Sequence, residues 1–63
     1  MYGNLRKELY MRSITMKDLA EHLGISTRTL QNKMNGKTDW TLTEALEVLN
    51  IIPGLTLEYL FAR

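Results

Sequence analysis

Residues 15–38 read TMKDLAEHLGISTRTLQNKMNGKT, and they contain two helical patterns separated by a glycine. The apolar residues of the first pattern recur at the i, i+3, i+4, i+7 spacing of an amphipathic helix. They are Met16, Leu19, Ala20 and Leu23. Gly24 suits the left-handed backbone conformation in which many helices end. The sequence therefore predicts one helix over about 15–23, a tight turn, and a second helix over about 27–35.

Three residues of this segment indicate how the two helices meet. Ala20 is small enough for a close helix–helix approach, and Gly24 allows the chain to turn within a few residues. Leu30 fills the angle between the helices. In this arrangement the outer face of the second helix stays free to enter a groove of DNA.

The rest of the chain is also helical in pattern. We expect a helix over about 4–12, a helix after the capping box Thr41–Glu44, a loop over 50–55 and a short last helix capped by Thr56. No strand-like alternation occurs, so the expected fold is all-α, with five helices in one compact domain over 1–63. The expected core consists of Leu5, Leu9, Leu19, Ala20, Leu23, Leu30, Leu46, Leu49 and Leu60.

Composition excludes several classes of function. The 63 residues include no cysteine and a single histidine, His22, so we expect no metal site, no cofactor and no catalytic constellation. No apolar run approaches the ~20 residues of a membrane span, which favours a soluble cytoplasmic protein that does not enter a membrane. The single expected domain leaves no second domain to sense a ligand, so we expect no small-molecule partner. Residues 1–37 carry seven Lys or Arg against three acids, whereas residues 38–63 carry one against four. This asymmetry favours a basic face toward a polyanion.

The second helix of the central segment has the side chains of a DNA reader. With Leu30 facing the core, Arg28, Asn32 and Asn35 fall on the opposite face at ~100° per residue. Arginine can bind guanine O6 and N7, and asparagine or glutamine can bind adenine N6 and N7. The helix has no acidic residue. The alternative interpretation is that Arg28 and Asn32 are ordinary solvated residues of a surface helix.

The sequence resembles the lambda-repressor-like helix-turn-helix proteins, which include phage repressors, Cro proteins and related bacterial regulators. The resemblance runs from Leu5 to Phe61 and is carried by residues 15–20, 23–26, Leu30, 35–38 and 46–49. It implies that the helix over 27–35 reads the major groove. Base contacts are then expected from Thr27, Arg28, Gln31 and Asn32, and phosphate contacts from Lys17, Lys37 and Thr38. Relatives usually have glutamine in place of Met16 and an apolar residue in place of Lys33. We expect Met34 to take over the packing and Lys33 to turn toward the phosphates.

Two functions follow as hypotheses. The first is a Cro-like phage or prophage repressor that binds a double-stranded DNA operator as a homodimer. Its interface is expected in the acidic half of the chain, because residues 51–63 are richer in apolar side chains than one short helix can bury. The interface residues are Leu55, Leu57, Leu60 and Phe61. The alternative is an antitoxin-like protein-interaction module that keeps the fold but binds DNA weakly.

Overall fold

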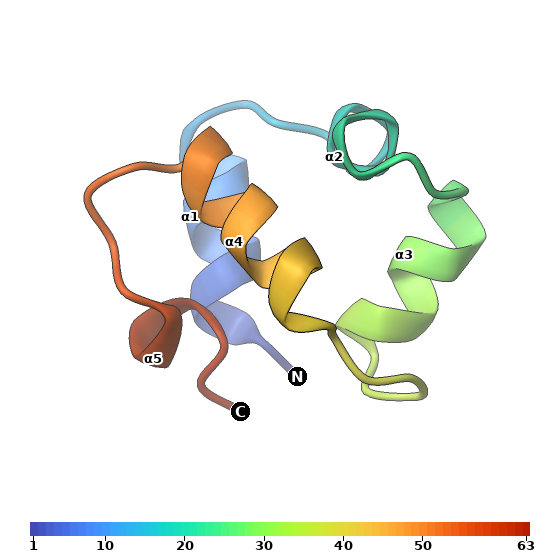
Figure 1. Ribbon diagram of the computed structural model, residues 1–63. Helices are drawn as coiled ribbons and strands as arrows, with labels where there is room; N and C mark the ends of the chain where they lie inside the picture. Colours follow the sequence, from blue (N-terminus) through green and yellow to red (C-terminus); the bar gives the residue numbers. More distant parts are fainter.

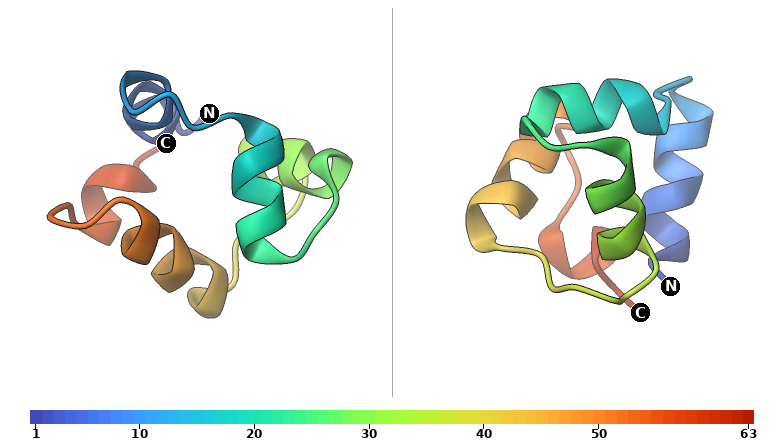
Figure 2. Two further views of the ribbon diagram at one scale, coloured as in Figure 1. Left: turned by 90° about the horizontal axis from the view of Figure 1, so that it is seen from above. Right: turned by 90° about the vertical axis from the view of Figure 1, so that its right-hand side faces the viewer.

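The computed structural model describes residues 1–63 and is all-helical (Figure 1). The five helices are α1 (Gly3–Met11), α2 (Met16–Leu23), α3 (Thr27–Met34), α4 (Leu42–Ile51) and α5 (Leu57–Leu60). The two termini lie side by side in every view, and α5 lies on the opposite side of the molecule from α3 (Figures 1 and 2). This confirms the predicted fold class. No helix has both the length and the hydropathy that a membrane span requires.

Local sequence explains where four of the helices begin. Thr15, Ser26, Thr41 and Thr56 each accept a hydrogen bond from the backbone N–H three residues ahead. Because the first turn of a helix leaves backbone N–H groups unpaired, such side chains stabilise its start. The Thr15–Asp18 and Thr41–Glu44 pairs form complete capping boxes. Gly24 ends α2 at φ 70°, the left-handed conformation that its position predicts.

The boundaries differ from the expected ones by small amounts. The first helix begins at Gly3 rather than Asn4, and the loop expected from Asn50 begins later because α4 continues to Ile51. The second helix of the central segment, α3, ends at Met34, with Asn35 as its C-cap. Helix ends commonly vary by one or two residues, so these shifts do not move the core face of any helix.

The predicted core is largely confirmed. Leu5, Leu9, Leu19, Leu30 and Leu60 are fully buried, Ala20 is nearly so, and Leu23 and Leu49 pack partly buried against them. Leu46 was wrongly placed in the core, since 47% of its surface is exposed. The buried face of α4 is formed by Ala45 and Val48 and continues into the C-cap Ile52. Leu46, two positions before Val48, points about 160° away from Val48 on the helical wheel.

A cluster of aromatic rings closes the lower end of the fold. Tyr2, Trp40 and Phe61 meet edge to face, with ring centroids 5.0–6.4 Å apart. Trp40 therefore packs against the core and does not stand free as a base-stacking ring. The cluster joins the start of α1, the α3–α4 loop and the end of α5.

Candidate nucleic-acid interface

Helix α3, the helix expected to read DNA, has one buried and one exposed face. Leu30 and Met34 are completely buried, which anchors the helix to the core. Thr27, Arg28 and Gln31 are exposed, and Asn32 is half-buried. The four side chains expected to contact bases therefore belong to one helix, whose buried side is fixed by packing.

The N-terminal end of α3 is electrostatically favourable for an anion. The Ser26 side chain accepts from the Thr29 N–H at 3.1 Å, and the first turn of the helix contains no acidic residue. Thr27 and Arg28 occupy this first turn. Because a helix N-terminus carries a partial positive charge, an approaching phosphate meets a favourable dipole there.

The residues expected to bind phosphate fall on two segments beside this helix. Lys17 is exposed in the first turn of α2, the helix that packs against α3. Hydrogen bonds from Thr15, from its backbone N–H and then from its side chain, hold the pKa of the neighbouring Asp18 carboxyl below its ordinary value. Lys37 and Thr38 are exposed in the loop that follows α3.

Lys33 does not have the role that the sequence analysis gave it. Its side chain is only 9% exposed, and its Nζ lies 3.0 Å from Glu44 Oε1 and donates to the Asp39 carbonyl at 3.0 Å. Lys33 follows Leu30 by three positions, so it falls about 60° from the centre of the buried face. The position of Lys33 on the helical wheel therefore indicates burial from the sequence alone. Lys33 is therefore removed from the set of phosphate contacts.

Arg6 on α1 is a residue of this region that the sequence analysis missed. Its guanidinium donates to Asn35 Oδ1 at 3.0 Å and lies 3.5 Å from the Met34 carbonyl oxygen. A cation at the C-terminal end of a helix is electrostatically favourable. Asn35, placed on the reader face by the wheel, is thus engaged by α1 at the end of α3.

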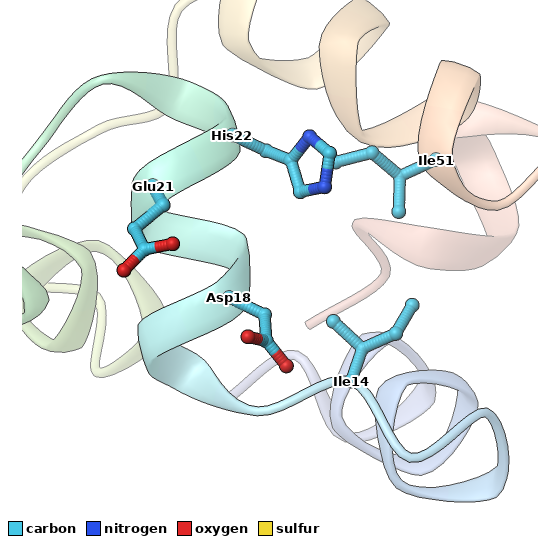
Figure 3. Close-up of a pocket in the computed structure, with 5 residues that line it drawn as sticks. All are labelled: Ile14, Asp18, Glu21, His22 and Ile51. Carbon is cyan, nitrogen blue, oxygen red and sulfur yellow. The ribbon is translucent and has the colours of Figure 1, made fainter.

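A pocket on another side of α2 is lined by acidic side chains, unlike the basic surface expected to meet phosphate. It lies between α2 and the end of α4, with Asp18, His22 and Ile51 among its walls, together with Ile14 and Glu21 (Figure 3). The exposed carboxylates of Asp18 and Glu21 disfavour phosphate at this pocket. DNA is therefore expected on α3 and its flanking segments.

The comparison with protein families agrees with this geometry. A family described as the Cro/C1-type HTH DNA-binding domain matches residues 4–52. The chain belongs to this family. No curated protein and no solved structure matches the chain. Family membership supports DNA as the partner of this domain. The matched residues run from Asn4 in α1 to the end of α4 and do not reach α5.

Proposed function

We propose that this Cro/C1-type domain is a small phage or prophage-type transcription regulator that reads an operator with α3. The observation that carries the proposal is the exposed face of α3. Arg28 and Gln31 are exposed on this face, whereas Leu30 and Met34 are buried on the opposite face and pack α3 against the core. Such a regulator acts by occupying DNA, in the cytoplasm of the cell that contains it.

Each side chain of this face has a distinct chemical use. Arg28 can donate two hydrogen bonds to guanine O6 and N7, and Gln31 or Asn32 can pair with adenine N6 and N7. Thr27 can meet a thymine methyl group or a phosphate at the start of the helix. Lys17, Lys37 and Thr38 are proposed to hold the sugar–phosphate backbone, which sets the position of α3 without reading sequence.

A second copy of the chain completes the proposal, because one helix contacts too few base pairs to define an operator. Leu42 and Leu46 are 67% and 47% exposed on α4, and the half-buried Leu57 and Phe61 on and after α5 line a groove beside Leu42. Leu55 is half-buried in the preceding loop, and we retain it as a rim residue. Leu60 is withdrawn from the interface, since its own core buries it completely.

The charges at the edge of this surface are compatible with a dimer of two-fold symmetry. Asp39 and Arg63, both exposed, lie 3.8 Å apart at its edge. In a symmetric dimer the same patch meets itself, so each acid can face the partner's base. Within one copy α5 lies on the opposite side of the molecule from α3 (Figures 1 and 2). We therefore expect a dimer formed around α5 to leave the α3 helix of each copy free. Two such helices can enter successive major grooves with centres ~34 Å apart.

Salt-dependent DNA binding tests the function class. The dissociation constant for a random 30-base-pair duplex is measured over a series of salt concentrations, with Lys37→Ala as the test variant and Lys7→Ala, an exposed lysine on α1, as the matched control. Neutralised phosphates release counterions, so the parent should show a steep slope that Lys37→Ala reduces by about one unit. Absence of salt-dependent binding would favour the protein-interaction module instead.

Sedimentation tests the homodimer. Leu46→Asp should convert the dimer to monomer with helicity retained, because Leu46 contributes little to the monomer core. Met11→Asp is the control, since Met11 is exposed on α1, outside the proposed surface. A parent that sediments as a monomer both free and on DNA, with a footprint of one half-site, would contradict the dimer.

A further inference from the structure

The ion pair between Lys33 and Glu44 connects the reader helix to the start of α4. The Glu44 side chain is 17% exposed, and its Oε1 receives both the Lys33 ammonium at 3.0 Å and the Thr41 backbone N–H at 2.9 Å. The same ammonium donates to the Asp39 carbonyl oxygen at 3.0 Å. One lysine thus joins α3, the α3–α4 loop and the capping box of α4.

These contacts hold the end of the α3–α4 loop that leads into α4, which we call the far end. The loop carries Lys37 and Thr38. The near end is held by Arg6, which donates to the Asn35 side chain, and by the Lys37 N–H, which donates to the Asn32 carbonyl at 2.9 Å. The loop is therefore tied to α1 and α3 at its start and to Lys33 and Glu44 at its end. Its exposed side chains project from a constrained backbone.

Stability alone does not explain why charges occupy this place. Taking a lysine and a glutamate out of water costs free energy that their attraction often only offsets, and apolar pairs of similar size can be as stable. The Lys33 ammonium is, however, shared between the Glu44 carboxylate and the Asp39 carbonyl, and these two bonds specify direction and distance more narrowly than apolar packing does. The pair therefore fixes local geometry in addition to any stability that it contributes.

We propose that Lys33 and Glu44 are positioning residues for DNA recognition, which set the α3–α4 loop relative to the reader helix so that backbone and base contacts form together. The inference rests on the proposed function, because it concerns how the same surface binds DNA. Lys33 acts here through Asp39 and Glu44 and does not touch phosphate.

Binding to two kinds of DNA separates positioning from a phosphate contact. The variants are Lys33→Met, which keeps an unbranched stem, and Glu44→Gln, which keeps a residue suited to the capping box. The probes are a duplex selected by the parent from a random pool and an unselected duplex of equal length. Lys33→Met should weaken binding to the selected duplex by about tenfold, as non-contacting residues can, and should change binding to the unselected duplex much less. The salt slope should stay that of the parent.

Three results of this binding experiment would overturn the inference. A salt slope reduced by about one unit, with both duplexes weakened alike, would make Lys33 a phosphate contact. Unchanged binding by both variants would show that the pair has no positioning role. If Lys33→Met does not fold, Glu44→Gln alone decides the test. A Glu44→Gln variant that keeps the DNA preference of the parent would reject the inference. A parent with no sequence preference would instead refute the proposed function.

Amide hydrogen exchange gives a readout that does not depend on DNA. In Lys33→Met, exchange of the Lys37 N–H should accelerate several-fold, since the loop loses its far anchor. The Ile25 N–H, bonded to the Ala20 carbonyl in the α2–α3 turn, is the internal control. Acceleration at both amides would report general destabilisation and reject the specific role. Acceleration at Lys37 alone supports the part of the inference that concerns the loop, namely that Lys33 holds its backbone in place.

Discussion

The hydroxyl of Tyr59 donates a 2.9 Å hydrogen bond to Oε2 of Glu8, joining residues 51 positions apart in the chain. The other carboxylate oxygen of Glu8 pairs with Arg12. Glu8 is one of two buried charged residues, the other being Lys33. Hydrogen bonds from Arg12 and then from Tyr59 hold the pKa of Glu8 below its ordinary value. The short helix α5 is therefore fastened to α1 by a polar contact as well as by Leu60.

Removing the Tyr59 hydroxyl should loosen this attachment. Tyr59→Phe leaves the ring in place but takes one hydrogen-bond donor from a charged acceptor, so the free energy of unfolding should fall by about 1–2 kcal/mol. Urea unfolding followed by circular dichroism measures it. Tyr10→Phe is the matched control, because Tyr10 is 86% exposed and should change stability little. Equal effects of the two variants would show that the Glu8 contact is unimportant.

Acid should destabilise the fold through three carboxylates. The pKa values of Glu8, Asp18 and Glu44 lie below their ordinary values. For Glu44 burial raises the pKa, but hydrogen bonds from Thr41 and Lys33 outweigh it. Depressed values favour the folded state above the unfolded pKa of about 4, and this stability is lost as the pH falls through the folded-state values.

The melting temperature should consequently stay nearly level from pH 7 to about 5 and decline below about 4. Glu44→Gln should start lower at pH 7 and show a shallower decline, because one of the three carboxylates no longer titrates. A melting temperature that rises on acidification would contradict the assigned pKa directions. Thermal scans in a buffer series at constant ionic strength provide the measurement.

The residues that sequence reasoning placed correctly are those governed by local rules. Thr15, Gly24 and Thr41 mark helix ends through short-range hydrogen bonds and backbone preference, and the structure has them as expected. Lys33 was misplaced because residue type was given more weight than its angle on the helix. The Glu8–Tyr59 contact could not be predicted, since nothing local relates two residues so distant in sequence.

Leu30 should be the most sensitive core position of the helix-turn-helix. Leu30→Ala removes buried methyl groups between α2 and α3 and should cost about 2–5 kcal/mol, enough to unfold much of so small a domain. Met11→Ala is the control, because Met11 is 66% exposed and lies outside the proposed dimer surface. The melting temperatures of the parent and both variants measure this effect. A Leu30→Ala variant as heat-stable as the parent would mean that the packing of α3 is misassigned.

Arg28 and Lys37 should differ in what they contribute to DNA binding. Arg28→Ala should lose about 1–3 kcal/mol of binding free energy on the preferred duplex and relax preference at one base position, since a bidentate contact discriminates by that amount. Lys37→Ala should weaken all duplexes alike. Competition binding with single-base variants of the site measures both effects. Two variants that bind preferred and random DNA as the parent does would show that α3 is not the reader.

Selection of bound duplexes from a random DNA pool tests the central claim most directly, because it asks whether this chain reads sequence at all. With α3 in the major groove of each of two half-sites, repeated rounds should enrich a two-fold symmetric site whose half-site centres lie about one helical turn apart. A pool that remains random after several rounds, despite retained binding, would contradict sequence recognition by α3.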